Sequence, residues 1–146
     1  MKIVIGSDHA AFETKEFVAE LLLSLKIEVI DVGPASAERC DYPDYASALV
    51  KVVLDQKISG ILLCGSGIGV SIVANRYKGI RAALCRTPID AEMARKHNDA
   101  NILCLGARTN SHEEIKAIID SWLESEFEGG RHSDRLKKFQ NLGETC

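Results

Sequence analysis

The chain has 146 residues, of which 46% are hydrophobic and 27% are charged, as in one soluble globular domain that buries its core without disulfides or metals. We therefore expect a single domain over residues 1–146. The net charge of −3 argues against a general nucleic-acid or anionic-membrane binder, because both need a cationic surface.

The N-terminal segment and the cysteines favour a cytoplasmic location. The first apolar run ends at Gly6, which makes it too short for a signal peptide or a membrane span. The five cysteines are odd in number and lack C-x-x-C spacing: Cys40, Cys64, Cys85, Cys104 and Cys146. We therefore expect free thiols in a reducing compartment, with no disulfide framework. Metal-ligand spacing is also missing, so we expect no metal.

Five short apolar runs predict β-strands. They are rich in Ile, Val, Leu and Cys and show almost no polar alternation, a pattern typical of strands buried on both faces. The runs are Lys2–Gly6, Ile27–Val32, Gly60–Cys64, Ile80–Cys85 and Ile102–Gly106.

Segments with a helical period lie between these runs. Shared faces are formed by Phe17, Leu21, Leu22 and Leu25 in the first, by Ile89, Met93 and His97 in the fourth, and by Ile115, Ile118, Ile119, Trp122 and Leu123 in the fifth. The alternation predicts an α/β fold, a three-layer Rossmann-like sandwich with a five-stranded parallel sheet and helices on both faces. Residues 129–142 predict a final helix beyond the sheet.

The loop after the first strand carries Ser7, Asp8 and His9. Either Ser7 or Asp8 could cap the next helix, but a carboxylate and a histidine at a strand's carboxyl end also suit a binding site. The loop lacks G-x-G-x-x-G, which weakens a dinucleotide-binding interpretation although Asp31 ends the second strand.

The loop after the third strand is glycine-rich and runs from Cys64 through Ser66 to Gly69. Its glycines allow a sharp turn that gathers backbone N–H groups at a helix N-terminus, an arrangement that binds an anion or a developing oxyanion. Cys64 is either a small buried hydrophobe or, beside that helix end, a thiolate base or nucleophile. Ser66 could move protons or cap the helix.

The C-terminal third carries basic and histidine side chains. His97 and Asn98 end the fourth helical segment, where His97 could belong to the core and Asn98 could be a left-handed cap. Arg131 and Arg135 are four residues apart, so one helix face could present both to a phosphate or to solvent. Arg108 follows the fifth strand and should point to the same edge as the other loops.

Several motifs in order resemble the ribose-5-phosphate isomerase B family, which includes the galactose-6-phosphate isomerase subunits. The resemblance spans nearly the whole chain and rests on Gly6-Ser7-Asp8-His9, Asp41-Tyr42-Pro43, Cys64-Gly65-Ser66-Gly67-Ile68-Gly69, His97-Asn98-Asp99 and Glu128-Gly129-Gly130-Arg131-His132. It implies an aldose–ketose isomerase of the pentose phosphate pathway, needing no cofactor, that interconverts ribose 5-phosphate and ribulose 5-phosphate.

The resemblance also implies a role for each matching residue. Cys64 would be the base that removes the C2 proton, because Val70 stands where other members have a glutamate. The backbone of Gly65, Ser66, Gly67, Ile68 and Gly69 would hold the enediolate, with Ser66 moving protons. His97 would open the furanose ring, aided by Asp8. His9, Tyr42 and Asn98 would line the substrate, while Arg108, Arg131 and Arg135 would hold its phosphate.

The resemblance further implies a homodimer whose C-terminal helix reaches the partner and whose sites are shared between subunits. The chain carries both halves of such a site, which we expect as a Cys64/His97 side and an Arg131/Arg135 side. Whether dimers pair further stays open. So do two alternatives: a hexose 6-phosphate isomerase acting on allose or galactose 6-phosphate, and a non-catalytic nucleotide-binding module.

Overall fold

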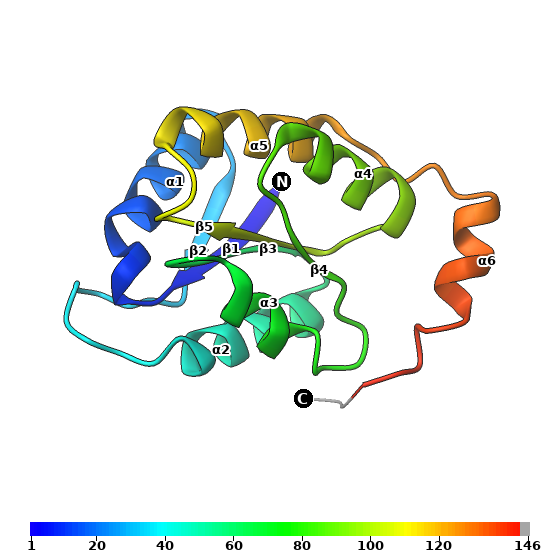
Figure 1. The fold of residues 1–146 in the computed structure, drawn as a ribbon, viewed down its shortest axis with the longest axis horizontal. Helices are drawn as coiled ribbons and strands as arrows, with labels where there is room; N and C mark the ends of the chain where they lie inside the picture. Colours follow the sequence, from blue (N-terminus) through cyan, green and yellow to red (C-terminus); the bar gives the residue numbers. More distant parts are fainter. Residues whose placement is uncertain (144–146) are drawn as a thin grey trace.

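The computed structural model describes residues 1–143, which form a five-stranded parallel sheet between two layers of helices (Figure 1). Residues 144–146, with Cys146, lie outside the described residues. The elements are β1 (Lys2–Ser7), the 3-10 helix η1 (His9–Ala11), α1 (Phe12–Ser24), β2 (Glu28–Asp31), α2 (Tyr42–Gln56), β3 (Ser59–Cys64), α3 (Ile68–Ala74), β4 (Ala82–Leu84), α4 (Pro88–Asn98), β5 (Ile102–Gly106), α5 (His112–Glu124) and α6 (Arg131–Lys137). The expected three-layer α/β fold is confirmed.

All five predicted strands are present, but only three are buried throughout most of their length. The sheet order is β2-β1-β3-β5-β4, so β1, β3 and β5 are central and covered by helices on both faces. The edge strands β2 and β4 are partly exposed. The expected burial on both faces is wrong for these two, because each has only one neighbouring strand.

The two faces of the sheet bury separate hydrophobic cores. Figure 1 shows α1, α4 and α5 along one face and α2 and α3 along the other. Val18, Ala91 and Ile118 pack into the first core, while Leu49 and Val70 pack into the second. Burial of these apolar side chains is the main driving force that holds the helices on the sheet.

The predicted helix faces are right for α5 and wrong for α4. In α5 the residues Ile115, Ile118, Ile119 and Trp122 are buried as expected. In α4 the buried residues are Ala91 and Ala94, whereas Ile89 and Met93 are 66% and 39% exposed. Small alanines let α4 pack closely against α5, which leaves its larger apolar side chains facing outward. In α1, Val18 and Leu22 form the buried face and Leu25 lies beyond the helix end.

The carboxyl ends of the strands form one edge of the sheet, and the chain changes direction there. It leaves β1 toward α1 on one face and leaves β3 toward α3 on the other. Asp8 N donates to Leu63 O at 3.2 Å between the two strand ends. Ligands of open α/β sheets bind at such a switch point, so the loops after β1 and β3 are in the expected place for a site.

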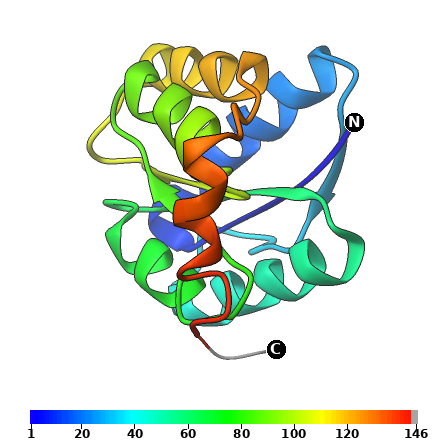
Figure 2. The same cartoon turned by 90° about the vertical axis from the view of Figure 1, so that its right-hand side faces the viewer.

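The C-terminal helix is shorter than the predicted residues 129–142, since α6 spans Arg131–Lys137. Figure 2 shows α6 in front of the sheet edge, running from the layer of α4 toward the opposite layer. Glu128 N donates to Lys96 O at 3.0 Å, which fixes the segment before α6 to the last turn of α4. No helix within residues 1–143 combines the length and the apolarity needed to cross a membrane.

We predict that Leu62→Ala destabilises the protein by about 2–5 kcal/mol, because Leu62 is fully buried in β3 and its loss leaves a cavity. Leu23→Ala removes the same atoms from a side chain that is 59% exposed and should cost no more than about 0.5 kcal/mol. Urea unfolding at one fixed protein concentration measures both. Equal losses would contradict the assigned core.

Candidate active site

One group of predicted site residues meets at the carboxyl end of the sheet. We call it the carboxyl-edge group; it consists of Asp8, His9, Tyr42, Cys64, Gly65, Ser66, Gly67, Ile68, Gly69 and Arg108.

Cys64 is the last residue of β3, and its thiol faces the turn that leads into α3. The side chain is 5% exposed, and Gly67 N donates to Cys64 Sγ at 3.1 Å. Gly67 has φ of 75°, a left-handed conformation that glycine adopts without strain. The turn therefore fixes the sulfur at the N-terminal end of α3. Ser66 Oγ accepts from Ile68 N at 3.2 Å, but the N-cap of α3 is Gly67, which has no side chain to cap the helix, so Ser66 is not the helix cap.

Tyr42 and Arg108 lie against the glycine-rich loop from different parts of the chain. A Cβ at Gly69 would be 2.7 Å from Tyr42 Cζ, and a Cβ at Gly65 would be 3.3 Å from Arg108 Nη1. Arg108 N also donates to Gly65 O at 2.9 Å. The glycines thus admit an aromatic ring and a guanidinium where any other residue would crowd them, and Arg108 reaches the expected edge.

Asp8 and His9 are each held by a hydrogen-bond contact on the same edge. Asp8 is 8% exposed, and its Oδ1 accepts from Ala11 N at 3.2 Å, which confirms the capping interpretation for this carboxylate. His9 Nδ1 lies 3.0 Å from Cys40 O. This contact holds the imidazole beside the segment that leads to Tyr42. The binding roles of both residues stay predictions.

A second group lies at the C-terminal end of α4 and on α6; we call it the helix-end group (His97, Asn98, Arg131 and Arg135). Asn98 is the last residue of α4, and the left-handed cap is Asp99, with φ of 44°; the prediction of a left-handed Asn98 is wrong. Arg81 Nη2 donates to Asp99 Oδ2 at 2.9 Å, which stabilises this cap. Asn98 lines a pocket of about 340 Å³ together with Phe139 and Leu142.

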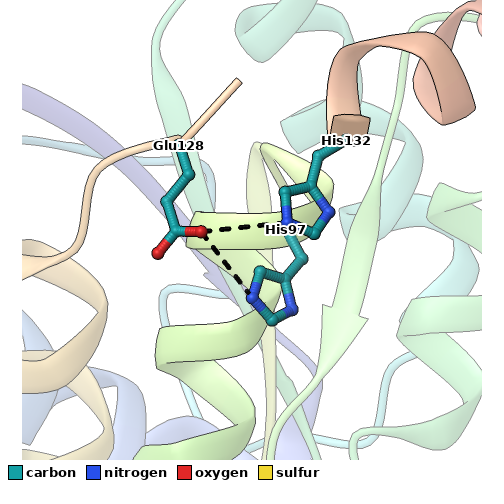
Figure 3. Close-up of side chains that lie close together, drawn as sticks. All are labelled: His97, Glu128 and His132. Atoms are coloured by element: carbon teal, nitrogen blue, oxygen red, sulfur yellow. Dashed lines mark ion pairs between the residues drawn. The ribbon is translucent and has the colours of Figure 1, made fainter. Parts of the chain in front are cut away.

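Arg131 and Arg135 are exposed and one turn apart on α6, as their spacing predicts. Between them, His132 is buried and stacks on His97 with ring centroids 4.3 Å apart and planes at 11°. Figure 3 shows Glu128 facing both rings, with its Oε2 4.0 Å from His97 Nε2 and 3.8 Å from His132 Nε2.

Glu128 and His132 were not among the predicted site residues. Their four-residue separation within Glu128-Gly129-Gly130-Arg131-His132 could have suggested a pair, although no pattern in sequence indicates the contact with His97. Burial lowers the pKa of His132 below its ordinary value, and the charges of His97, Arg131 and Arg135 lower it further while Glu128 opposes them. His132 is therefore neutral at pH 7.

The two groups are far apart in one chain. In the sheet register Cys64 lies beside Gly106, whereas His97 and Asn98 of the helix-end group precede Ile102, at the other end of β5. Four residues of strand separate these positions by about 13 Å. The expectation that Cys64 and His97 form one side of the site within a single chain is therefore wrong. Helix α4 runs antiparallel to the strands, so its last turn, with His97, lies at the opposite edge of the sheet. There His97 contacts His132 of α6.

Asp31 takes part in an ion pair, not in an open nucleotide site. The Lys15 ammonium, only 1% exposed, contacts Asp31 Oδ2, and Gly33 N donates to Asp31 Oδ1 at 2.8 Å. Burial alone would lower the pKa of Lys15, but its hydrogen bonds to Asp31 and Glu16 outweigh burial and raise it. The carboxylate that a dinucleotide's ribose would need is thus already bound, which disfavours the nucleotide-binding alternative.

Comparison with known proteins identifies the relatives of this chain. A family model described as Ribose/Galactose Isomerase matches residues 3–139. Ribose-5-phosphate isomerase B of Escherichia coli is 44% identical over 137 residues, covering 93% of this chain and 92% of that protein.

Solved structures of ribose-5-phosphate isomerase B resemble this chain in fold and in sequence. Ribose-5-phosphate isomerase B of Clostridium thermocellum has a TM-score of 0.94 and 45% identity, with 96% of this chain and 95% of that chain covered. The enzyme of Mycoplasma genitalium with bound ribulose-5-phosphate has a TM-score of 0.91 and 39% identity, with 95% of this chain and 93% of that chain covered.

We predict that iodoacetamide at pH 8 labels Cys64 in the folded protein much faster than Cys85 or Cys104. Burial raises the pKa of Cys85 to about 12 and that of Cys104 well above its ordinary value. At pH 8 both side chains therefore remain protonated thiols and react slowly, because alkylation requires the thiolate. Peptide mass spectrometry measures each rate, with urea-unfolded protein as the control. Equal labelling of Cys64 and Cys104 in the native protein would contradict the assigned environments.

Proposed function

The chain belongs to the ribose/galactose isomerase family, and on that premise we propose that it is an aldose–ketose isomerase interconverting ribose 5-phosphate and ribulose 5-phosphate. The observation that carries the proposal is the Cys64 thiol held at the N-terminal end of α3, in a chain that matches ribose-5-phosphate isomerase B over nearly its full length. The free thiols of Cys40, Cys64, Cys85 and Cys104 support the proposed cytoplasmic location.

In the proposed reaction Cys64 is the base. Its thiolate removes the C2 proton of the open-chain aldose, and the electron pair moves to form a cis-enediolate across C1 and C2. Ser66 transfers a proton between O1 and O2, and return of the proton from sulfur to C1 gives the ketose. The position of Val70 supports a cysteine base, since this residue is fully buried in the core and offers no carboxylate.

The glycine-rich loop supplies the electrostatic part of the mechanism. The backbone N–H groups of the Gly65–Gly69 loop that are not already bonded to Cys64 Sγ or Ser66 Oγ would face developing negative charge on the enediolate oxygen, and one such donor lowers the barrier by about 3 kcal/mol. Asp8, His9 and Tyr42, on the same edge, would orient the sugar hydroxyls. Arg108 lies over the loop and would contact the anionic end of the substrate.

His97, Asn98, Arg131 and Arg135 would enter the same site from a second copy of the chain. His97 would act as the acid for furanose ring opening, and the two arginines would hold the phosphate. The separation of the two groups within one chain supports this arrangement, because no single chain brings the thiol and His97 together.

Exposed apolar side chains also support a homodimer. Ile68 and Ile72 of α3 are 44% and 60% exposed, and Ile89 and Met93 of α4 are 66% and 39% exposed. Both helices contact the edge strand β4, so the four side chains belong to the two helices that adjoin an open sheet edge. Apolar surface of this kind marks an interface with another protein surface.

A hexose 6-phosphate isomerase remains the second candidate, because the family description includes galactose. Turnover on ribose 5-phosphate, compared with turnover on allose 6-phosphate and galactose 6-phosphate, decides between the two. The proposal expects the pentose to have the higher kcat/KM. A higher value for either hexose would replace it with the second candidate.

We predict that Cys64→Ala lowers kcat on ribose 5-phosphate by about 10²–10⁴-fold with little change in substrate affinity, because the base acts only in the proton transfer. Cys40→Ala is the matched control and should keep near-normal turnover, since its thiol has no part in the mechanism. Near-normal turnover of Cys64→Ala would overturn the assignment of the base.

A shared site predicts complementation between two inactive variants. In a heterodimer of Cys64→Ala and His97→Asn chains, one site carries both substitutions and the other carries neither. Doubly tagged heterodimers should therefore recover about half of the wild-type activity, because a two-fold dimer has two equivalent sites. Each homodimer is the control and should be nearly inactive. A heterodimer as inactive as its parents would show that the site is not divided this way.

A further inference from the structure

Three potential metal ligands converge where α4 meets the segment before α6. One ring nitrogen of His97, one ring nitrogen of His132 and a Glu128 carboxylate oxygen lie within 4.8 Å of one another, and Figure 3 shows the carboxylate facing the edges of both rings. The cluster combines three levels of exposure: the side chain of His132 is 7% exposed, that of His97 35% and that of Glu128 52%.

The distances are close to those of a coordination site. Imidazole nitrogen and carboxylate oxygen bind zinc at about 2.0–2.2 Å, which places tetrahedral ligands about 3.4 Å apart. The carboxylate is 4.0 Å from His97 Nε2 and 3.8 Å from His132 Nε2. Each of these two distances is about half an ångström longer than the spacing of tetrahedral zinc ligands, so a movement of that size would bring the carboxylate to a ligand position. The exposed side chain of Glu128 has the freedom to make this shift.

The ring stacking is the contact that an ion would replace. With planes at 11° and centroids 4.3 Å apart, the in-plane lone pairs of the two rings run side by side and must tilt toward a common point. His97 can tilt because a third of its side chain is exposed, whereas His132 is fixed by burial in α6. His132 would thus be the anchor ligand, with His97 and Glu128 closing on the ion.

The charge and chemistry of the cluster select the kind of ion. Two imidazoles and one carboxylate suit zinc and similar transition metals, while magnesium prefers oxygen ligands and retains its water. Arg131 and Arg135 flank His132 on α6 and oppose any weakly bound cation. Only an ion that forms strong bonds to imidazole would overcome that repulsion.

We propose that His97, Glu128 and His132 form a binding site for one divalent transition-metal ion, such as Zn²⁺, and that the bound ion inhibits the enzyme by occupying the ring-opening histidine. The inhibitory effect rests on the proposed function, because it requires His97 to act on the substrate. The binding itself rests only on the three side chains.

Binding is tested by calorimetric titration of the full-length protein with ZnCl₂, and with MgCl₂ for comparison. We expect one Zn²⁺ site per chain that is unoccupied by Mg²⁺. Glu128→Gln and His132→Asn should weaken Zn²⁺ binding by about 100-fold or more, since even residues behind metal ligands contribute 10–100-fold. Glu126→Gln makes the same change on an exposed side chain two residues from Glu128 and should bind Zn²⁺ normally.

Thermal melting of each variant without metal separates loss of a ligand from loss of the fold; Glu128→Gln changes an exposed side chain and should melt like the wild type. Equal Zn²⁺ affinity in the wild type and in Glu128→Gln overturns the site. So does Zn²⁺ binding that disappears in Cys64→Ala, which would place the ion on the thiolate.

Inhibition is tested separately on ribose 5-phosphate turnover. Zn²⁺ should inhibit the wild type, a chelator should restore activity, and the inhibition constant of Glu128→Gln should rise by the same factor as its dissociation constant. Tight binding without inhibition, in an active enzyme, overturns the proposed effect on His97. Tight binding in a protein that does not turn over any sugar phosphate overturns the proposed function and leaves the metal site intact.

Discussion

The direction of the parallel strands governs the rest of this molecule. In a parallel sheet every strand ends at the same edge, and every returning helix ends at the opposite edge. Cys64 is the last residue of β3 and is therefore at the carboxyl edge, while His97 is in the last turn of α4 and is at the opposite edge. No side-chain motion could bring the two together within one chain, since a strand's length separates them. A reaction that uses both residues requires a second copy.

The surface of the chain is consistent with that requirement. Ile68 and Ile72 on α3, and Ile89 and Met93 on α4, are large apolar side chains, yet all four are exposed on the two helices that contact β4. Exposing such side chains to water costs free energy that burial against a partner recovers. The alanines that pack α4 onto the fold leave its larger apolar residues free for this contact. In the proposed dimer, α4 would therefore pack on the core with one face and contact the partner with the other.

The segment before α6 connects the proposed ring-opening acid to the proposed phosphate site. The backbone contact between Glu128 and Lys96 sets where α6 begins, so the stacked His97–His132 pair and the two arginines are positioned together. The lowered pKa of His132 favours its neutral ring, which avoids placing a second positive charge against His97 and beside the two arginines. His97, Glu128 and His132 are also the three ligands of the proposed metal site. In this proposal, the residue that donates the proton for ring opening is therefore also a residue that a transition-metal ion can block.

Much of the architecture could be predicted from local patterns. The apolar runs located all five strands, and the α5 face from Ile115 to Trp122 was correct, because burial imposes a period that is visible in a short segment. The glycine-rich turn after Cys64 and the position of Arg131 and Arg135 on one helix could likewise be predicted, because each depends on a few neighbouring residues. The burial of the edge strands was wrong because neighbours in a sheet depend on strand order, which no short segment specifies.

The sequence by itself determined which chemical groups this protein carries and at which strand or helix end each one lies, because those features depend on residues close together in the chain. The tertiary structure alone decided which groups meet. It placed Tyr42 and Arg108 on the glycine-rich loop, separated His97 from Cys64, and brought Glu128 and His132 to His97. Such contacts join residues distant in sequence, and the physical reason for each is the packing of whole helices on a twisted sheet.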